Sequence, residues 1–251
     1  MLNLVKVLTR LGDRQHLVRE KAALELEDLD FTAEAAEIAT SFITVMFSSQ
    51  RWEDRFGAIL GCTSLAKKAI AYTGDFLLKT VVEQKVPAMM FDSEFRVRNQ
   101  VGTLLKVFLS QCDAEIRLGQ FIRLKDILIE NIEQTIVRDQ QQQEISKIIA
   151  DQKNEKKMHD TEGWKSLDTS MNCLKSLIEA IGKKILNIDI SDVLAMINKS
   201  AQHLNRFVKE IAFQIINTLI EACKENTCDK TMQIYEITMP LISTGLTDIW
   251  P

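Results

Sequence analysis

The hydrophobic residues of this chain recur every three to four positions over long stretches, which is the period of an amphipathic α-helix. The clearest stretch is His203–Cys223. Its apolar residues form one broad stripe, and Phe213 lies off that stripe, so we expect this helix to contact neighbours on more than one side. The stripe consists of Leu204, Phe207, Val208, Ile211, Ala212, Ile215, Ile216, Leu219 and Ile220.

Five further stretches show the same helical period. No run alternates apolar and polar residues between turn signals as a β-strand would. Proline and glycine, which interrupt helices, are scarce, at 3 and 9 of 251 residues. The sequence therefore predicts an all-α fold. The five stretches are Phe31–Phe47, Arg55–Ala71, Arg98–Cys112, Ile116–Val137 and Trp164–Ile181.

A short phrase recurs along these stretches: a basic residue, usually after an apolar one, then a small or apolar residue three positions later, and an apolar residue four positions after that. Arg19, Arg55 and Arg98 are the basic residues of the first three copies, at steps of about 40 residues, a period typical of helical repeats. Weaker copies contain Arg117 and Lys209. The phrase indicates a repeated helix pair.

At this phrase the sequence resembles the HEAT repeats and the related armadillo repeats. In that family the second helix of a pair often opens with Asp, then Val-Arg, then a small residue. The resemblance implies a right-handed α-solenoid of antiparallel helix pairs. It also implies a structural ladder of acidic and basic side chains between successive repeats. Carried over residue by residue, the ladder falls on Asp13, Arg19, Asp54, Arg55 and Arg98.

One region interrupts the pattern. Between Arg138 and Asp160 the chain is rich in glutamine and charge, and apolar residues nearly vanish after Ile149. Such composition rarely buries enough apolar area to order itself, so we favour a solvated insertion or an extended helix; a projecting arm that binds a partner is the alternative. The predicted organisation is N-terminal repeats at 1–137, a polar insertion at 138–162 and C-terminal repeats at 163–251. Because a complete solenoid ends in a polar capping face, and none is evident here, we expect the repeats to continue beyond Pro251.

Charge and cysteine usage narrow the function classes. The formal net charge of −4 lacks the basic excess of a non-specific nucleic-acid binder. No signal peptide and no membrane-spanning apolar run is present. Irregular cysteine spacing indicates reduced thiols, which predicts an intracellular protein, cytoplasmic or alternatively nuclear. The cysteines are Cys62, Cys112, Cys173, Cys223 and Cys228.

Motifs for catalysis are missing. The sequence has no phosphate loop, nucleophile elbow or metal-binding helix. None of His16, His159 and His203 has a Cys or His neighbour at ligand spacing. We therefore expect no enzyme activity, no cofactor and no metal. Candidate partner contacts are Trp52, Trp164 and Trp250, because tryptophan is enriched at binding hot spots. Packing between repeats explains these tryptophans as well, and we favour it.

These observations predict a non-catalytic scaffold or adaptor, a segment of a larger HEAT-repeat protein. It would bind partner proteins through the solenoid surface, with the polar insertion as a second contact. The main alternative is a nucleic-acid- or tRNA-handling repeat protein in which scattered lysines and arginines align on one face. An all-α lipid- or isoprenoid-processing enzyme is disfavoured, since the chain has no Asp-Asp-x-x-Asp run.

Overall fold

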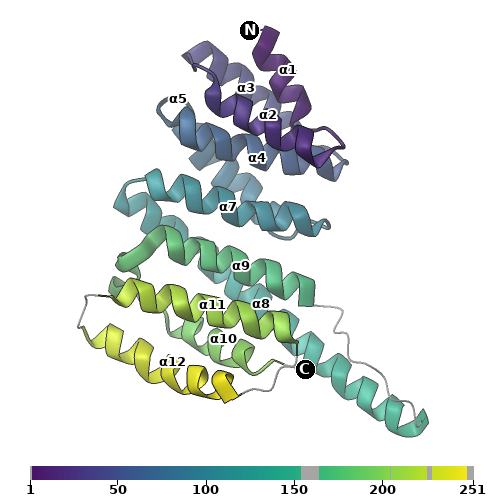
Figure 1. Ribbon diagram of the computed structural model, residues 1–251, viewed down its shortest axis with the longest axis vertical. Helices are drawn as coiled ribbons and strands as arrows, with labels where there is room; N and C mark the ends of the chain where they lie inside the picture. Colours follow the sequence, from purple (N-terminus) through teal and green to yellow (C-terminus); the bar gives the residue numbers. More distant parts are fainter. Residues whose placement is uncertain (1, 154–163, 204, 225–227, 248–251) are drawn as a thin grey trace. The chain divides into compact units, whose positions relative to one another are not determined.

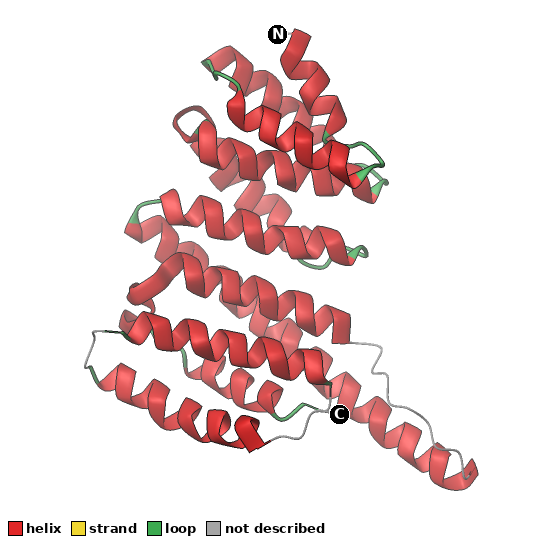
Figure 2. Cartoon of the chain, viewed as in Figure 1, coloured by secondary structure: helices red, strands yellow, loops and turns green. Residues whose placement is uncertain are grey.

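Helices account for all regular structure in the computed structural model, which describes residues 2–153, 164–203, 205–224 and 228–247 (Figures 1 and 2). No strand occurs within these ranges, so the predicted all-α fold is confirmed. The chain divides into two compact units, Met1–Leu118 and Gly119–Pro251.

The first unit is built from helix pairs. The second helices of successive pairs, α2, α4 and α7, pack side by side, while α3 packs against α1, α4 and α5. The segment from α5 through η1 to α6 is one continuous helical stretch with a wider turn in its middle, and α6 packs against α7. The bounds are α1 Leu2–Arg10, α2 His16–Asp28, α3 Ala33–Phe47, α4 Trp52–Lys68, α5 Ile70–Asp75, η1 Phe76–Lys85, α6 Val86–Met89 and α7 Phe95–Gln111.

The second unit repeats this arrangement with fewer helices. Helices α9 and α11 pack side by side, α10 packs against α11, and α12 packs against both α10 and α11. Helix α8 begins in the first unit, and its residues after Leu118 belong to the second. The bounds are α8 Ala114–Lys153, α9 Trp164–Ile181, η2 Gly182–Asn187, α10 Ser191–Ala201, α11 Arg206–Cys223 and α12 Asp229–Thr247.

Helix starts follow local capping chemistry. The Thr32 hydroxyl accepts a hydrogen bond from the Ala35 backbone N–H (3.2 Å), which sets the start of α3. The Asn205 side chain accepts one from the Phe207 N–H (2.9 Å) and sets the start of α11. The predicted helix from His203 therefore starts too early. The observed helix begins at Arg206, after the capping residue Asn205, whose backbone is extended.

The predicted insertion is partly helical. Helix α8 runs without a break to Lys153, as expected of an extended polar helix, while residues 154–163 lie outside the described residues. The predicted boundary at 137 falls inside α8, whereas the compact units meet after Leu118. The three-part organisation therefore stays a prediction.

The core of the first unit depends on close approach of α4 to its neighbours. Both faces of α4 are buried, and small residues on it let other backbones come near. Gly57 is the tightest point: a Cβ placed there would lie 2.0 Å from the Leu11 carbonyl oxygen, in the turn after α1. No side chain fits at that position.

We expect Gly57→Ala to destabilise the protein by about 1–3 kcal/mol, because the added methyl group must push two backbones apart. Gly119→Ala is the matched control, since a Cβ there meets nothing within 4 Å on the exposed side of α8. Replacing that glycine should raise stability by up to about 1 kcal/mol through helix propensity. Urea unfolding followed by circular dichroism measures both. Equal effects of the two substitutions would contradict the close packing at α4.

Candidate functional site

A basic residue occupies the fourth position of five helices, α2, α4, α7, α8 and α11. In the four with arginine, the guanidinium donates back to carbonyl oxygens of the turn before its own helix and, for Arg117, also of the last turn of α7. Those carbonyls have no helical partner, so the arginine satisfies them and fixes the helix start. The bonds run from Arg19 to Asp13 O (2.6 Å) and Arg14 O (3.1 Å), from Arg55 to Ser49 O (3.0 Å) and Gln50 O (2.9 Å), from Arg98 to Asp92 O (2.6 Å) and Ser93 O (3.4 Å), and from Arg117 to Ser110 O (2.9 Å) and Cys112 O (2.8 Å).

Arg55 also connects two successive helix pairs. Its Nε and Nη2 donate to the two carboxylate oxygens of Asp92, at 2.6 and 2.8 Å, and Asp92 lies in the turn before α7. The Asp92 side chain is only 4% exposed. Burial raises the pKa of Asp92, but hydrogen bonds from Arg55 and from the Glu94 backbone N–H outweigh burial, so the pKa lies below that of an ordinary aspartate. The pair holds α4 to the turn of the next repeat.

Arg19 occupies the corresponding place one repeat earlier and meets aromatic rings. Its guanidinium lies 5.0 Å from the Trp52 ring centroid and 5.1 Å from that of Phe56. The Arg96 guanidinium lies 4.7 Å from the same Trp52 ring. Arg19 is almost fully buried, and that burial lowers its pKa. Cation–π contacts therefore replace the ion pair at this junction.

In the second unit, aromatic rings gather at the starts of α9 and α11. Trp164 and Phe207 stack with ring centroids 4.9 Å apart and 22° between their planes. A cation lies near each ring: Lys165 Nζ is 5.7 Å from Trp164, and the Arg206 guanidinium is 4.8 Å from Phe207. Phe207 remains 39% exposed, so this aromatic pair reaches the surface.

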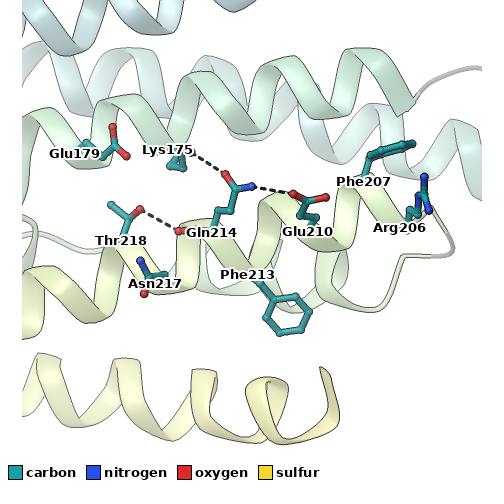
Figure 3. A pocket seen from close by; sticks show the side chains of 9 residues that line it. All are labelled: Lys175, Glu179, Arg206, Phe207, Glu210, Phe213, Gln214, Asn217 and Thr218. Carbon is teal, nitrogen blue, oxygen red and sulfur yellow. Dashed lines mark hydrogen bonds between the residues drawn. The ribbon is translucent and has the colours of Figure 1, made fainter. Parts of the chain in front are cut away.

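A groove of about 850 Å³ has Phe207 in its lining and follows α9 and α11. Figure 3 shows a row of polar side chains along it, joined by hydrogen bonds. Lys175 Nζ donates to Gln214 Oε1 (2.8 Å), and Gln214 Nε2 donates to Glu210 Oε1 (3.3 Å). The groove therefore combines an apolar end with fixed donors and acceptors. Its lining is Lys175, Glu179, Arg206, Phe207, Glu210, Phe213, Gln214, Asn217 and Thr218.

Asp168 lies on α9 two turns before Lys175, and so on the same helical face. Its side chain is half-buried. Burial raises the pKa of Asp168, and the negative charge of Glu210 raises it further. A hydrogen bond from Asn172 and the positive charge of Lys175 lower it. The net pKa lies above that of an ordinary aspartate. A shifted carboxyl beside a groove is a common property of functional sites.

No protein-family model matches this sequence, and no curated protein matches it. Among solved structures, Kap121p bound to Pho4p is similar at a TM-score of 0.67 and 17% identity over 97% of this chain. This chain has a HEAT/armadillo-type helical-repeat fold. It spans 23% of the Kap121p chain. Two engineered proteins also match, at TM-scores of 0.47 and 0.42 and identities of 11% and 15%; each match covers 98% of this chain, and 98% and 100% of theirs. These values are too low to carry an argument.

The HEAT-type ladder residues have different placements. Asp13 accepts a hydrogen bond from the Gln15 N–H (2.7 Å) in its own turn. Asp54 accepts one from the Ser49 hydroxyl (2.7 Å) and lies 3.7 Å from Arg51, again within its own repeat. The carboxylate that Arg55 binds in the next repeat is Asp92, which sequence reasoning missed as a ladder residue. The missed signal was spacing, because Asp92 precedes Arg98 by the same six residues that separate Asp13 from Arg19.

The tryptophans of this HEAT-type fold lie in separate places. Trp52 is half-buried under the two guanidinium groups of Arg19 and Arg96 in the first unit. Trp164 lies in the second unit, stacked on Phe207. Trp250, like His159, lies outside the described residues. Partner contact by any of them stays a prediction.

Other chemistry is limited in the described part of the chain. All five cysteines are free thiols; Cys62 and Cys173 are fully buried, and burial raises the pKa of Cys173 to about 12. Within the described ranges, no three His, Cys, Asp or Glu side chains are grouped so that they could hold a metal ion. None of the helices found there is long and apolar enough to cross a membrane.

We expect Arg55→Ala to lower the free energy of unfolding by about 3 kcal/mol, because it leaves Asp92 buried without its cation and the turn carbonyls without their donor. Lys79→Ala is the control, since the Lys79–Asp75 pair is exposed and should contribute under about 1 kcal/mol. Denaturant unfolding at neutral pH measures the difference. Similar losses of unfolding free energy for both substitutions would contradict a large contribution of the Arg55–Asp92 pair to stability.

The same pair predicts a pH dependence. The pKa of Asp92 is lowered in the folded state, so its stabilisation is complete above the pKa of an unfolded aspartate, about 4. That stabilisation should disappear as the pH falls further, through the lowered pKa of Asp92. The stability difference between the natural chain and Asp92→Asn should therefore be constant from pH 7 to about pH 5 and shrink below about pH 4. A difference that does not change with pH would show that the Asp92 charge contributes nothing.

Proposed function

We propose that this chain is a non-catalytic scaffold that binds partner proteins, and that the groove along α9 and α11 is a contact surface. The observation that carries the proposal is the groove itself. It joins a surface-exposed aromatic pair to a row of ordered polar groups, the combination expected of a binding hot spot with orienting hydrogen bonds. Successive second helices of a helical-repeat protein provide such extended surfaces.

Charge favours a protein over a nucleic acid as the partner. The groove lining contains two basic residues, Lys175 and Arg206, and two acidic ones, Glu179 and Glu210, with Asp168 close by. Phosphate groups are bound by a basic excess, which this lining lacks. The free thiols, two of them fully buried, support an intracellular site of action.

We expect affinity capture from cell extract with the natural chain to recover proteins that Phe207→Ala fails to retain. Phe207 is exposed, so its removal should leave the fold intact while it removes the apolar anchor of the groove. Glu236→Ala, on the exposed side of α12 and outside the groove, is the matched control. Each recovered protein is then purified and its affinity for the three chains is measured by calorimetry.

The expected loss of affinity for Phe207→Ala is about tenfold or more, with no change for Glu236→Ala. Equal binding by Phe207→Ala and the natural chain would exclude the groove as the contact surface. Recovery of nucleic acid, with an affinity that falls steeply with salt concentration, would favour the nucleic-acid alternative.

A further inference from the structure

Helix α12 has an exposed apolar stripe. One side of α12 packs against α10 and α11, and its residues Ile234 and Thr238 are fully buried. Met232, Met239 and Leu246 follow one another at intervals of seven residues, about two helical turns, so they lie on one stripe. Their exposed fractions are 58%, 54% and 82%. These three side chains, which we call the α12 stripe, form an apolar surface that a partner can reach.

Helix α1, in the first unit, has a similar stripe. It packs against α2 and α3, and its residues Val7 and Leu8 are fully buried. Leu2 and Val5 are 76% and 44% exposed, and Lys6 is exposed beside them. We call Leu2 and Val5 the α1 stripe. Neighbouring exposed apolar side chains of this kind mark surfaces that other molecules cover.

The two helices carry opposite charge beside their stripes. Both charged side chains of α1 are basic; Arg10 forms an ion pair with Glu25 of α2, and Lys6 is exposed one turn after the start of the stripe. Helix α12 has two acidic residues and one basic residue, a net charge of −1, and Glu236 is exposed one turn after the start of its stripe. Contact between α1 and α12 therefore places a basic helix beside an acidic one, whereas pairing two copies of either helix brings like charges together.

We propose that the α12 stripe of one copy of this chain packs against the α1 stripe of a second copy. Methionine side chains adapt to an irregular facing surface, which suits a contact between two unequal helices. Glu236 of one copy would pair with Lys6 of the other at the edge of the contact. Because the two surfaces differ, the contact is heterologous, and copies join into rings or open chains. The inference goes beyond the proposed function and uses no residue of the groove.

Other occupants satisfy fewer of these features. A helix from a different protein could cover the α12 stripe, but it would leave the α1 stripe exposed. A lipid surface binds amphipathic helices whose polar side is rich in lysine and arginine, whereas the charged residues of α12 are mostly acidic. A second copy of the chain covers both stripes and pairs their charges.

Variants with one blocked stripe test the proposal in the full chain. Leu2→Glu puts an acid on the α1 stripe, where Glu236 of the other copy repels it, and Met239→Lys puts a base on the α12 stripe, where Lys6 repels it. Sedimentation velocity between about 1 and 100 µM should show the natural chain rising above its monomer mass of 28.6 kDa as its concentration increases. Each variant should weaken this association about tenfold or more. A natural chain that stays monomeric throughout would overturn the proposal.

An equimolar mixture of the two variants identifies the surfaces that meet. The Leu2→Glu chain keeps a natural α12 stripe and the Met239→Lys chain keeps a natural α1 stripe, so the mixture should form heterodimers with the affinity of the natural contact. Val45→Glu is the matched control, because Val45 is 74% exposed on α3 and belongs to neither stripe, and this variant should associate like the natural chain. If the mixture associates no better than either variant alone, the assignment of the two stripes is wrong.

Charge reversal is a second test that removes no apolar surface. Lys6→Glu and Glu236→Lys should each weaken self-association about threefold or more, and the chain with both substitutions should recover most of that loss. Circular dichroism checks that each variant folds, as expected for exposed positions. A doubly substituted chain that associates no better than the single variants would show that these two residues do not meet, which overturns the pairing of α1 with α12.

Self-association and partner binding by the groove fail separately. If Phe207→Ala loses its captured partners while the natural chain stays monomeric, the groove binds proteins and the self-association is wrong. If self-association follows the α1 and α12 variants while Phe207→Ala retains every partner, the second copy docks as proposed and the groove is not a contact surface. Partner affinities are compared below the concentration at which the chain self-associates, so that Glu236→Ala remains a control for the groove.

Discussion

Backbone carbonyl oxygens at the turns between helices must find donors, and in the first unit the arginine at the fourth position of each second helix supplies them. The requirement is strict because these turns lie where one helix pair meets the next, and a buried carbonyl without a donor costs free energy comparable to a lost hydrogen bond. Arg19, Arg55 and Arg98 meet it with the same pair of bonds. Once the turn is fixed, α2, α4 and α7 start at equivalent points and can stack side by side.

What the same arginine does with its remaining nitrogens differs between junctions. At Arg55 they bind Asp92, and at Arg19 the guanidinium lies against Trp52 and Phe56. Ser49, in the turn before α4, is equivalent to Asp92, in the turn before α7. Each side chain accepts a hydrogen bond from the backbone N–H of the residue two positions later in the chain. A serine cannot form the ion pair, and the aromatic rings take its place. The repeat therefore preserves the bonds to the backbone and varies the bonds to side chains.

This difference explains how far the sequence could predict the structure. Helical period and the spacing of Arg19, Arg55 and Arg98 depend on local geometry, so the all-α fold and the repeat were predictable. Asp92, the partner of Arg55, belongs to the next repeat. Predicting it as the ladder residue in place of Asp54 requires knowing which turn lies against which helix. The groove is harder still to predict. Trp164 meets Phe207, and Lys175 meets Gln214, only through the register of α9 against α11.

The two units treat buried charge in opposite ways. In the first, the nearly buried Asp92 has a bidentate cation, and its pKa is lowered; in the second, burial raises the pKa of Asp168, and no bidentate cation offsets that rise. Lys175, two turns along the same helix face, opposes the rise in the pKa of Asp168 but does not cancel it, and its ammonium group donates to Gln214 at 2.8 Å. The charged form of Asp92 therefore stabilises the first unit, whereas burial disfavours the charged form of Asp168 in the second.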